Sequence, residues 1–315
     1  MTKTYVEYLI EDLRRTTENE EFSELVGIPN RDFLRYMNDA QFRIHSLIVN
    51  KHPQVFLKDK IFNDTVGRRD YDIPFDAHLD NQISDVKYRE GVTFDYYRLK
   101  PDVISNDTNN ERNSFSGTPH RYFRRSGKVM LDNTPKQRGS LMITYVGTVP
   151  RLDLRRGQVS EVTIDESTRT ITSLRLDTVT QQIDANALTR TTRICFVDDE
   201  GNIQMSNIRI TEVDTTTGII SVHSDHVFEE GETISVGDYV TAGPLSTTHI
   251  PLDSVVERYV MSYATTKILQ QEGSEELVPE AQTLAQMEAD IVASYADISD
   301  DFIEIPDINN EDWYT

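Results

Sequence analysis

The fold is predicted from one stretch of the sequence, Ser246–Gln271, which reads STTHIPLDSVVERYVMSYATTKILQQ. It begins as an extended segment, turns at Pro251 and continues as the most regular helical pattern in the chain. Ser254 precedes Glu257 by three residues, which predicts a capping box at the helix start. A mainly apolar stripe follows at steps of three and four residues, formed by Val256, Tyr259, Val260, Tyr263, Ala264, Lys267 and Ile268. We expect a scaffold helix against which the rest of the chain packs.

Helical periodicity recurs in three other places. Residues 4–17 put Val6, Leu9, Ile10 and Leu13 on one side of a short amphipathic helix. Asn30 is the predicted N-cap of a helix that runs to about Asn50. Pro279 opens another helix at its first turn, and that helix extends to about Ala296. The N- and C-terminal segments together predict a helical bundle.

From Gln54 to Tyr145 the hydrophobic period is two, which is typical of strands. Ser126-Gly127 is a predicted hairpin turn, and residues 101–118 are the most loop-like stretch. We expect a small antiparallel β region here. The predicted fold class is therefore α+β, with an α-helical bundle packed on this small region and an all-β domain inserted into the chain.

The inserted domain is predicted from residues 157–243. Short β runs alternate there with turn signals such as Asp199–Asn202 and Asp214–Gly218, which is typical of a small barrel or sandwich. The core chain then resumes at His249–Leu252. The predicted domains are a discontinuous core, 1–156 and 244–299, the insertion, 157–243, and an extended docking tail, 300–315.

The formal net charge of −21 is unevenly distributed. Residues 157–243 carry 5 basic and 15 acidic groups, and residues 244–315 carry 2 and 15. Residues 1–156, with 25 basic and 23 acidic groups, are close to neutral. Such an acidic surface disfavours tight wrapping of nucleic acid, because phosphate contacts require Lys and Arg. It suits a wall past which DNA slides without binding.

Cysteine content and hydropathy exclude other classes. A single cysteine, Cys195, cannot form an internal disulfide or a Cys-based zinc cage, and its strand-like neighbours predict burial. The first residues lack the basic start and apolar run of a signal peptide, and no stretch reaches the length of a membrane span. We expect a reduced, soluble protein that is made in the cytosol and has no membrane segment.

No catalytic motif is present in the sequence. It contains no Gly-rich phosphate loop, no Gly-x-Ser-x-Gly elbow and no His-Glu-x-x-His. The nearest metal-like cluster, His223-Ser-Asp225-His226 with Glu229 and Glu230, falls in a polar connection between predicted strands. We therefore expect no enzyme activity and no catalytic, cofactor-binding or metal site.

Two segments are candidate binding surfaces. The basic hairpin with Arg121, Arg124, Arg125 and Lys128 is predicted to pair with acidic groups of a neighbouring copy, with DNA contact as the alternative. The tail alternates carboxylates with large apolar side chains and is predicted to dock on a partner, with a frayed end as the alternative. Its predicted docking residues are Phe302, Ile303, Ile305, Ile308, Trp313 and Tyr314.

The order of segments resembles one family of proteins. The segments that carry the resemblance are Asn38-Asp-Ala-Gln41, Arg69-Asp-Tyr-Asp-Ile-Pro74, Gly117-Thr-Pro-His-Arg-Tyr122, Leu141-Met-Ile-Thr-Tyr145 and Ile250-Pro251-Leu252. In this order they resemble the head-to-tail adaptor, or connector, proteins of tailed bacteriophages, particularly those of short-tailed phages. The resemblance covers roughly residues 4–155 and 246–300, so the role of the insertion is not inherited from it.

The resemblance implies a structural virion protein at the head–tail junction. Such adaptors form a ring, usually of twelve copies, which is fitted under the portal vertex and presents a platform for the tail. The implied partners are further copies of the chain, the portal protein and a tail nozzle or tail-fibre protein, while DNA passes through the channel without specific binding. The predicted docking residues of the tail, Phe302 to Tyr314, are expected to contact the portal. The residues also leave two other classes open: a glycan hydrolase with paired carboxylates, and a module that binds carbohydrate or protein.

Overall fold

A computed structural model describes residues 4–19, 29–78, 83–91, 94–102, 116–165, 167–177, 188, 191–214, 216–223, 232–272 and 277–300. The chain divides into two compact units. The first, here called the helix–barrel unit, contains Met1–His45 and Val149–Ile291. The second, here called the sandwich unit, contains Ser46–Thr148 and Val292–Thr315.

The sandwich unit is built from two four-stranded sheets. In one sheet the order is β1 (Leu57–Phe62), β8 (Gly139–Val146), β3 (Ile83–Glu90) and β4 (Tyr97–Arg98). In the other it is β2 (Asp70–Asp72), β7 (Lys128–Leu131), β6 (Arg121–Arg125) and β5 (Lys100–Pro101). A short 3₁₀ turn, η2 (Pro53–Phe56), precedes β1. The predicted turn at Ser126-Gly127 joins β6 to β7, and both residues have the positive φ angles that a two-residue hairpin of this kind requires.

A single hydrophobic cluster joins the two sheets of the sandwich unit. It includes Tyr71 and Tyr122, which belong to two of the segments that carry the family resemblance. Both residues are almost fully buried, because alternate positions of β2 and β6 point into the sandwich. Those segments therefore build the core of this unit.

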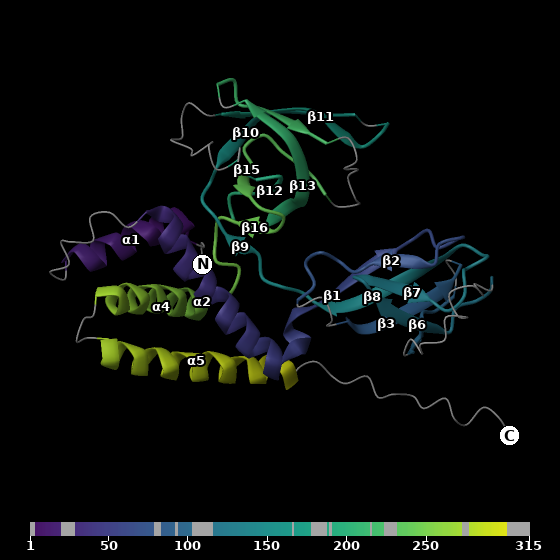
Figure 1. Cartoon of the computed structure of the whole chain (residues 1–315), viewed down its shortest axis with the longest axis horizontal. Helices are drawn as coiled ribbons and strands as arrows, with labels where there is room; N and C mark the ends of the chain where they lie inside the picture. The colour runs from purple at the N-terminus through teal and green to yellow at the C-terminus, as the bar shows by residue number, and fades with distance from the viewer. Residues whose placement is uncertain are drawn as a thin grey trace. The chain divides into compact units, whose positions relative to one another are not determined.

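The helix–barrel unit contains a closed six-stranded barrel, visible in Figure 1. The order of its strands is β10 (Gly157–Asp165), β11 (Thr170–Asp177), β14 (Ile219–Val222), β13 (Ile203–Asp214), β12 (Arg193–Val197) and β15 (Tyr239–Ala242). Pairing of β15 with β10 closes the barrel, which removes both free sheet edges. Whether 157–243 folds as an independent domain stays a prediction.

Acidic side chains shape the tight turns of the barrel. Asp165 accepts hydrogen bonds from the hydroxyl and backbone N–H of Ser167, and Asp214 accepts them from the hydroxyl of Thr217 and the N–H of Thr216. These bonds lower the pKa of both carboxyls below the ordinary value. Part of the acidity of the barrel is therefore explained by turn formation.

The turn after β12 uses a third aspartate in the same way. The Asp198 carboxylate accepts hydrogen bonds from the N–H groups of Glu200 and Asn202 and from the side chain of Gln204. Burial alone would raise the pKa of Asp198, but these bonds lower it. The predicted turns at Asp199–Asn202 and Asp214–Gly218 are confirmed.

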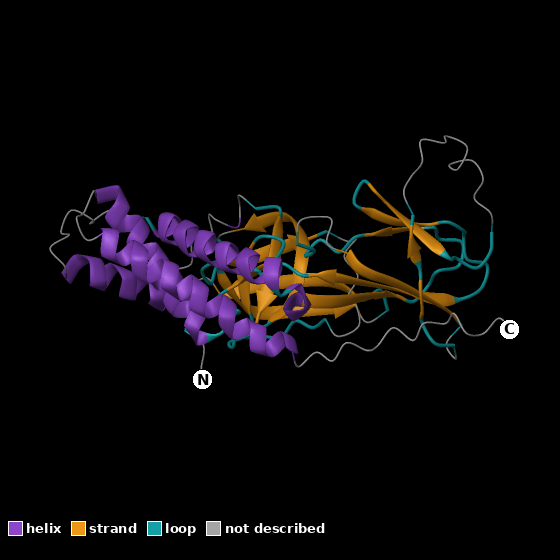
Figure 2. Cartoon of the chain, turned by 90° about the horizontal axis from the view of Figure 1, so that it is seen from below, coloured by secondary structure: helices purple, strands orange, loops and turns teal. Residues whose placement is uncertain are grey.

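Four α-helices lie among the described residues: α1 (Val6–Asn19), α2 (Asn30–Lys51), α4 (Ser254–Glu272) and α5 (Leu277–Asp300). Figure 1 shows α4 running alongside α5, and Figure 2 shows the helices in purple. The Arg43 guanidinium of α2 forms a two-point ion pair with Glu288 of α5, at 2.7 and 3.1 Å, and the Tyr259 hydroxyl of α4 donates to the same carboxylate at 2.8 Å. Burial, followed by this bond, raises the pKa of Tyr259.

The N-cap of the central helix lies one residue before its predicted position at Ser254. The Asp253 carboxylate accepts hydrogen bonds from the backbone N–H groups of Val255 and Val256, at 3.0 and 3.1 Å. Asp253 is therefore the N-cap, and Ser254 is the first helical residue. The predicted capping box at Ser254 is wrong, because the carboxylate one residue earlier takes the exposed donors.

Other predictions for single elements are confirmed. Cys195 is a free, fully buried thiol, and burial raises its pKa. The predicted stripe of α4 is buried at Val256, Tyr259, Val260, Ala264 and Ile268. Tyr263 and Lys267, which were placed on the same stripe, are half-buried.

The predicted fold class is wrong, because the fold is mostly β and not a helical bundle on a small β region. The region between α2 and the barrel holds two complete sheets with a core of their own. Several strands, such as β4, β5, β9 (Arg151–Leu152) and β16 (Ser246–Thr247), are only two residues long. A two-residue strand has no measurable period, so a sequence pattern underestimates a sheet made of such strands.

The cap of α4 makes a testable prediction. Asp253→Ala should lower the free energy of unfolding by about 1 kcal/mol, because two N–H groups lose their acceptor. Ser254→Ala is the matched control and should change stability by no more than a few tenths of a kcal/mol. Urea unfolding followed by circular dichroism measures both. If Ser254→Ala loses more free energy of unfolding than Asp253→Ala, Ser254 is the cap and the capping box is correct.

The turn aspartates predict a pH dependence. A carboxylate whose pKa is lowered in the folded state stabilises that state above its unfolded pKa of about 3.9, and this contribution is lost as the pH falls through the folded pKa. The wild type should therefore lose thermal stability on acidification more steeply than the triple variant Asp165→Asn/Asp198→Asn/Asp214→Asn. Equal slopes in thermal melts recorded from neutral pH down to about pH 2 would contradict this account.

Candidate functional site

The chain enters and leaves the barrel through one narrow stem, defined here as residues 149–156 and 242–250. Within it, β9 and β16 form a parallel pair in which Arg151 lies beside Ser246 and Leu152 beside Thr247. The pair is only two residues long, so it satisfies few of the backbone groups of the stem. Side chains from the helices supply the missing partners.

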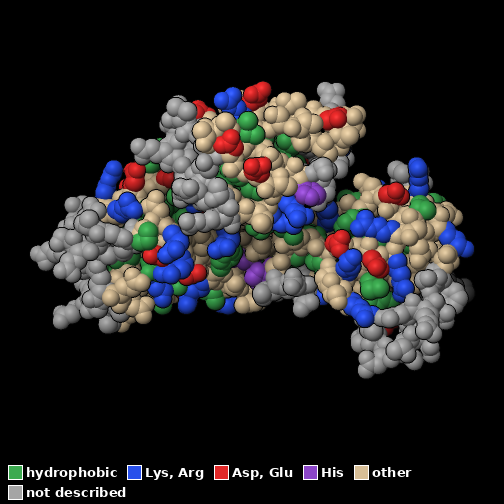
Figure 3. Space-filling view, turned by 45° about the horizontal axis from the view of Figure 1, so that its top comes forward, with side chains coloured by type: hydrophobic (Ala, Val, Ile, Leu, Met, Phe, Trp, Pro, Cys, Tyr) green, Lys and Arg blue, Asp and Glu red, His purple; other side chains and the backbone are tan. Residues whose placement is uncertain are grey.

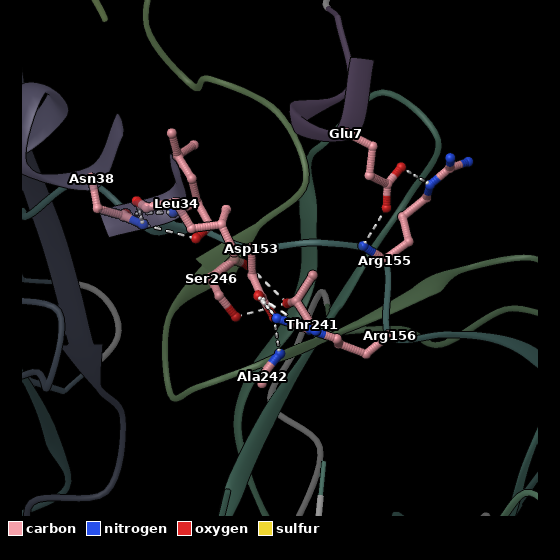
Figure 4. A network of polar contacts seen from close by, with 10 residues as sticks. Glu7, Leu34, Asn38, Asp153, Arg155, Arg156, Thr241, Ala242 and Ser246 are labelled. Atoms are coloured by element: carbon pink, nitrogen blue, oxygen red, sulfur yellow. Dashed lines mark hydrogen bonds and ion pairs between the residues drawn. The ribbon is translucent and has the colours of Figure 1, made fainter. Parts of the chain in front are cut away.

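Helix α2 holds the entering strand of the stem. The Asn38 side chain accepts a hydrogen bond from the Leu152 N–H at 2.8 Å and donates to the Leu152 carbonyl at 3.0 Å (Figure 4). It also donates to the Leu34 carbonyl of its own helix at 2.8 Å. One turn further on, the Gln41 amide donates to the Pro150 carbonyl at 2.6 Å. Asn38 and Gln41 are buried, so these contacts are shielded from water.

A buried ion pair connects the stem to the barrel. Asp153 and Arg156 are paired at 2.6 Å, and only 10% and 11% of their side chains are exposed. The same Asp153 carboxylate accepts a hydrogen bond from the Ala242 N–H at 2.7 Å (Figure 4). It thus connects the entering chain to the last strand of the barrel.

Helix α1 and the residue before it also contact the stem. The Glu7 carboxylate accepts hydrogen bonds from the backbone N–H and the guanidinium of Arg155 (Figure 4). This guanidinium also lies over the rings of Tyr5 and Tyr239, at 4.4 and 5.2 Å from their centroids. Burial raises the pKa of the Tyr5 hydroxyl to about 12. The hydroxyl is therefore protonated at neutral pH and donates to the Asp199 carbonyl at 3.0 Å.

The turn after β12 packs against the returning half of the stem. Thr247 donates a hydrogen bond to the Gly201 carbonyl at 2.8 Å. Gly201 has a φ of +84°, and a Cβ there would lie 2.5 Å from the Nδ1 atom of His249. Only glycine meets both the backbone conformation and the close approach at this point.

Beside the stem lies a groove of about 500 Å³, here called the stem groove. One wall is the first part of α2, and the other is the stem itself with the chain that follows β15. Apolar groups of Leu34, Leu152, Leu154 and Pro244 line it together with four arginine side chains. The four arginines are Arg31, Arg35, Arg151 and Arg156.

In the part of the chain that the structure describes, two of these arginine side chains have partners and two do not. Arg156 is paired with Asp153, and Arg35 with Asp32 at 3.5 Å. Arg31 and Arg151 are exposed, and among the described residues neither side chain has a hydrogen bond or ion pair. The groove therefore carries an excess of positive charge in a protein whose net charge is −21.

Guanidinium groups bind carboxylates and phosphates through two parallel hydrogen bonds, so the stem groove is suited to an anionic group on an otherwise apolar ligand. Figure 3 shows one face of the molecule, on which Lys and Arg side chains are spread over the helices while the barrel shows mainly uncharged groups and carboxylates. The groove itself is lined by residues of α2, the stem and the chain that follows β15.

The predicted basic hairpin has local partners in the sandwich unit. Arg121 pairs with Asp102 at 3.0 Å, and Lys128 pairs with Asp72 at 3.4 Å. The Arg124 guanidinium donates to the Ile83 carbonyl at 2.7 Å, and Arg125 also has an interaction partner. A role of these four residues in a subunit interface stays a prediction. Their charges are partly used within the chain, unlike those of Arg31 and Arg151.

The other predicted site residues lie mostly outside the described residues. These are the tail residues Phe302, Ile303, Ile305, Ile308, Trp313 and Tyr314, together with Asp225, His226, Glu229 and Glu230 of the metal-like cluster. Among the described residues, no group of three His, Cys, Asp or Glu side chains could hold a metal ion. In the same residues, no helix is both long and apolar enough to cross a membrane.

The stem groove was not predicted from the sequence. Arg31 and Arg35 are spaced by one helical turn, which places them on the same side of α2. The run Arg151-Leu-Asp-Leu-Arg-Arg156 is a second local concentration of basic residues. Each signal by itself is typical of a solvated surface. Only the tertiary structure brings the two together, since they are more than 100 residues apart.

The hydrogen bonds between Asn38 of α2 and Leu152 of the stem can be tested by mutation. Asn38→Leu should lower the free energy of unfolding by about 2–4 kcal/mol, because the buried N–H and carbonyl of Leu152 lose their partners. Asp39→Leu, at the exposed neighbouring position, is the matched control and should have little effect. Equal losses in chemical denaturation would show that Asn38 does not hold the stem.

Comparison with known proteins does not identify a family for this chain. No protein-family model matches the sequence, and no curated protein matches it significantly. What the groove binds is therefore inferred from its own chemistry.

Proposed function

We propose that this protein is a structural subunit that assembles with copies of itself into a ring, and that the ring joins the portal vertex of a tailed-phage head to the tail. In this proposal the protein is made in the host cytoplasm and resides in the virion at the head–tail junction. The observation that carries it is the stem groove, where two arginine side chains have no partner among the described residues of a strongly acidic protein.

The charge of the groove favours one kind of contact between copies. A two-fold contact built around the groove would bring positive charges from both copies together, which costs free energy at short distance. A head-to-tail contact instead sets the groove of one copy against acidic groups of the next. Head-to-tail contacts generate rings when the rotation closes. The charge pattern thus supports a ring rather than a symmetric dimer.

The acidic surface also fits a DNA conduit. The segment 157–243 has a net charge of −10, and the segment 244–315 has a net charge of −13. Groups of this sign repel phosphates, so a channel lined by them would let DNA pass without holding it. Three barrel aspartates are engaged in turns, but many other carboxylates of these segments add to the field.

The family resemblance links such a ring to a phage head. Its segments Arg69–Pro74 and Gly117–Tyr122 each contribute a tyrosine to the core of the sandwich unit, so they are tied to the fold and not to a variable surface. By this resemblance, the partners of the ring are the portal protein on one side and a tail nozzle or tail-fibre protein on the other.

The ring makes a testable prediction. The purified chain, sized by light scattering alone and with a purified portal ring, should form a closed oligomer at low salt, and Arg31→Glu/Arg151→Glu should prevent it. Arg175→Glu/Arg209→Glu is the control, because it reverses two exposed charges on the barrel. The oligomer should weaken as salt rises, since exposed ion pairs are screened.

A wild-type chain that stays monomeric both alone and with the portal would contradict the ring. A ring that forms equally well with the groove arginines reversed would instead contradict the role of the groove.

A further inference from the structure

The shape and chemistry of the stem groove restrict what it can hold. Its volume of about 500 Å³ is in the range of sites that take a drug-sized group or a few residues of peptide. Its apolar groups come from Leu34, Leu152, Leu154 and Pro244, and its guanidinium groups come from both walls. A matching ligand carries apolar side chains with carboxylates on either side of them.

We propose that the stem groove binds the acidic segment Asp300–Asp307 of a neighbouring copy. The sequence there is Asp-Asp-Phe-Ile-Glu-Ile-Pro-Asp. This inference rests on the proposed ring, because a second copy of the chain must supply the segment.

The order of residues in this segment matches the groove. On an extended backbone alternate side chains point the same way, so Asp301, Ile303, Ile305 and Asp307 share one side. The two isoleucines lie between the two carboxylates, which are about 20 Å apart in such a backbone. The residue before Pro306 favours an extended backbone. The isoleucines would pack on the apolar groups while the carboxylates reach arginines on opposite walls.

Three other acidic stretches of the chain match less well. The carboxylates of Asp198–Glu200 belong to a turn that already uses Asp198, and residues 272–276 have no large apolar side chain. The stretch 18–24 has one phenylalanine but no pair of apolar residues between carboxylates. The charge also favours the tail, since residues 300–312 hold six carboxylates and no basic residue.

The test uses the full chain and a labelled peptide of residues 299–315. The protein carries Asp301→Asn, Glu304→Gln and Asp307→Asn in its own tail, so that this tail does not compete with the probe. Fluorescence polarisation then measures binding of the peptide at low salt. A peptide with the same three replacements is the comparison probe, and a peptide of residues 18–28 tests the other acidic stretch.

We expect saturable binding of the wild-type peptide. Arg31→Ala/Arg151→Ala should weaken it roughly tenfold, because two exposed charge pairs are lost. The control Arg175→Ala/Arg209→Ala removes the same charge from the barrel and should change the affinity by less than about twofold. Both pairs of arginines are exposed, and thermal melts check that each variant is folded.

Several results would overturn the proposal. Equal affinities of the groove and control variants would exclude the groove, and tighter binding of the 18–28 peptide would identify a different occupant. Duplex DNA can be added at the same concentration of negative charges as the peptide. If it displaces the probe, the groove is a general polyanion site. Unsaturable binding here, with a ring still seen by light scattering, would reject this inference and leave the ring intact. Saturable binding without any ring would reject the ring alone.

Discussion

The hydrogen bonds of Asn38 to the backbone of Leu152 are the contact on which the helix–barrel unit depends. The chain must leave the helices, build a closed barrel and return, and it does so through a stem with a ladder two residues long. Peptide groups buried at such a crossing lose water, and each unpaired group costs free energy. A buried amide with both donor and acceptor can satisfy the N–H and carbonyl of one residue together, which no apolar side chain can do.

This crossing also explains why an acidic protein has a basic groove. Holding Leu152 against α2 places the flanking Arg151 beside the first turns of the helix, where Arg31 and Arg35 project. Asp153 and Asp32 neutralise two of the four guanidinium groups, and no described residue neutralises the others. The groove is thus a by-product of how the stem is anchored, and its remaining charge is available to a partner.

Acidic residues of the barrel serve two separate purposes. Asp165, Asp198 and Asp214 each accept N–H groups of a tight turn, so they contribute to folding. Other exposed carboxylates, such as Glu161 and Glu212, lie on strand surfaces and contribute mainly to the electric field. The acids that shape the turns are thus separate from those that contribute mainly to the surface field.

The sequence by itself determined the features that depend on neighbours along the chain. The buried stripe of α4, the burial of Cys195 and the turns at Asp198 and Asp214 follow from local periodicity and turn chemistry. Even there, the choice between Asp253 and Ser254 as the cap was decided by which side chain reaches the free N–H groups. The tertiary structure alone decided the mostly β fold class, the anchoring role of Asn38 and the stem groove. The two-residue strands β9 and β16 pair only after the chain has built the barrel and returned, and the groove joins arginines more than 100 residues apart. Hydrophobic period is a property of adjacent residues, whereas the pairing of polar groups across long separations is set by chain closure.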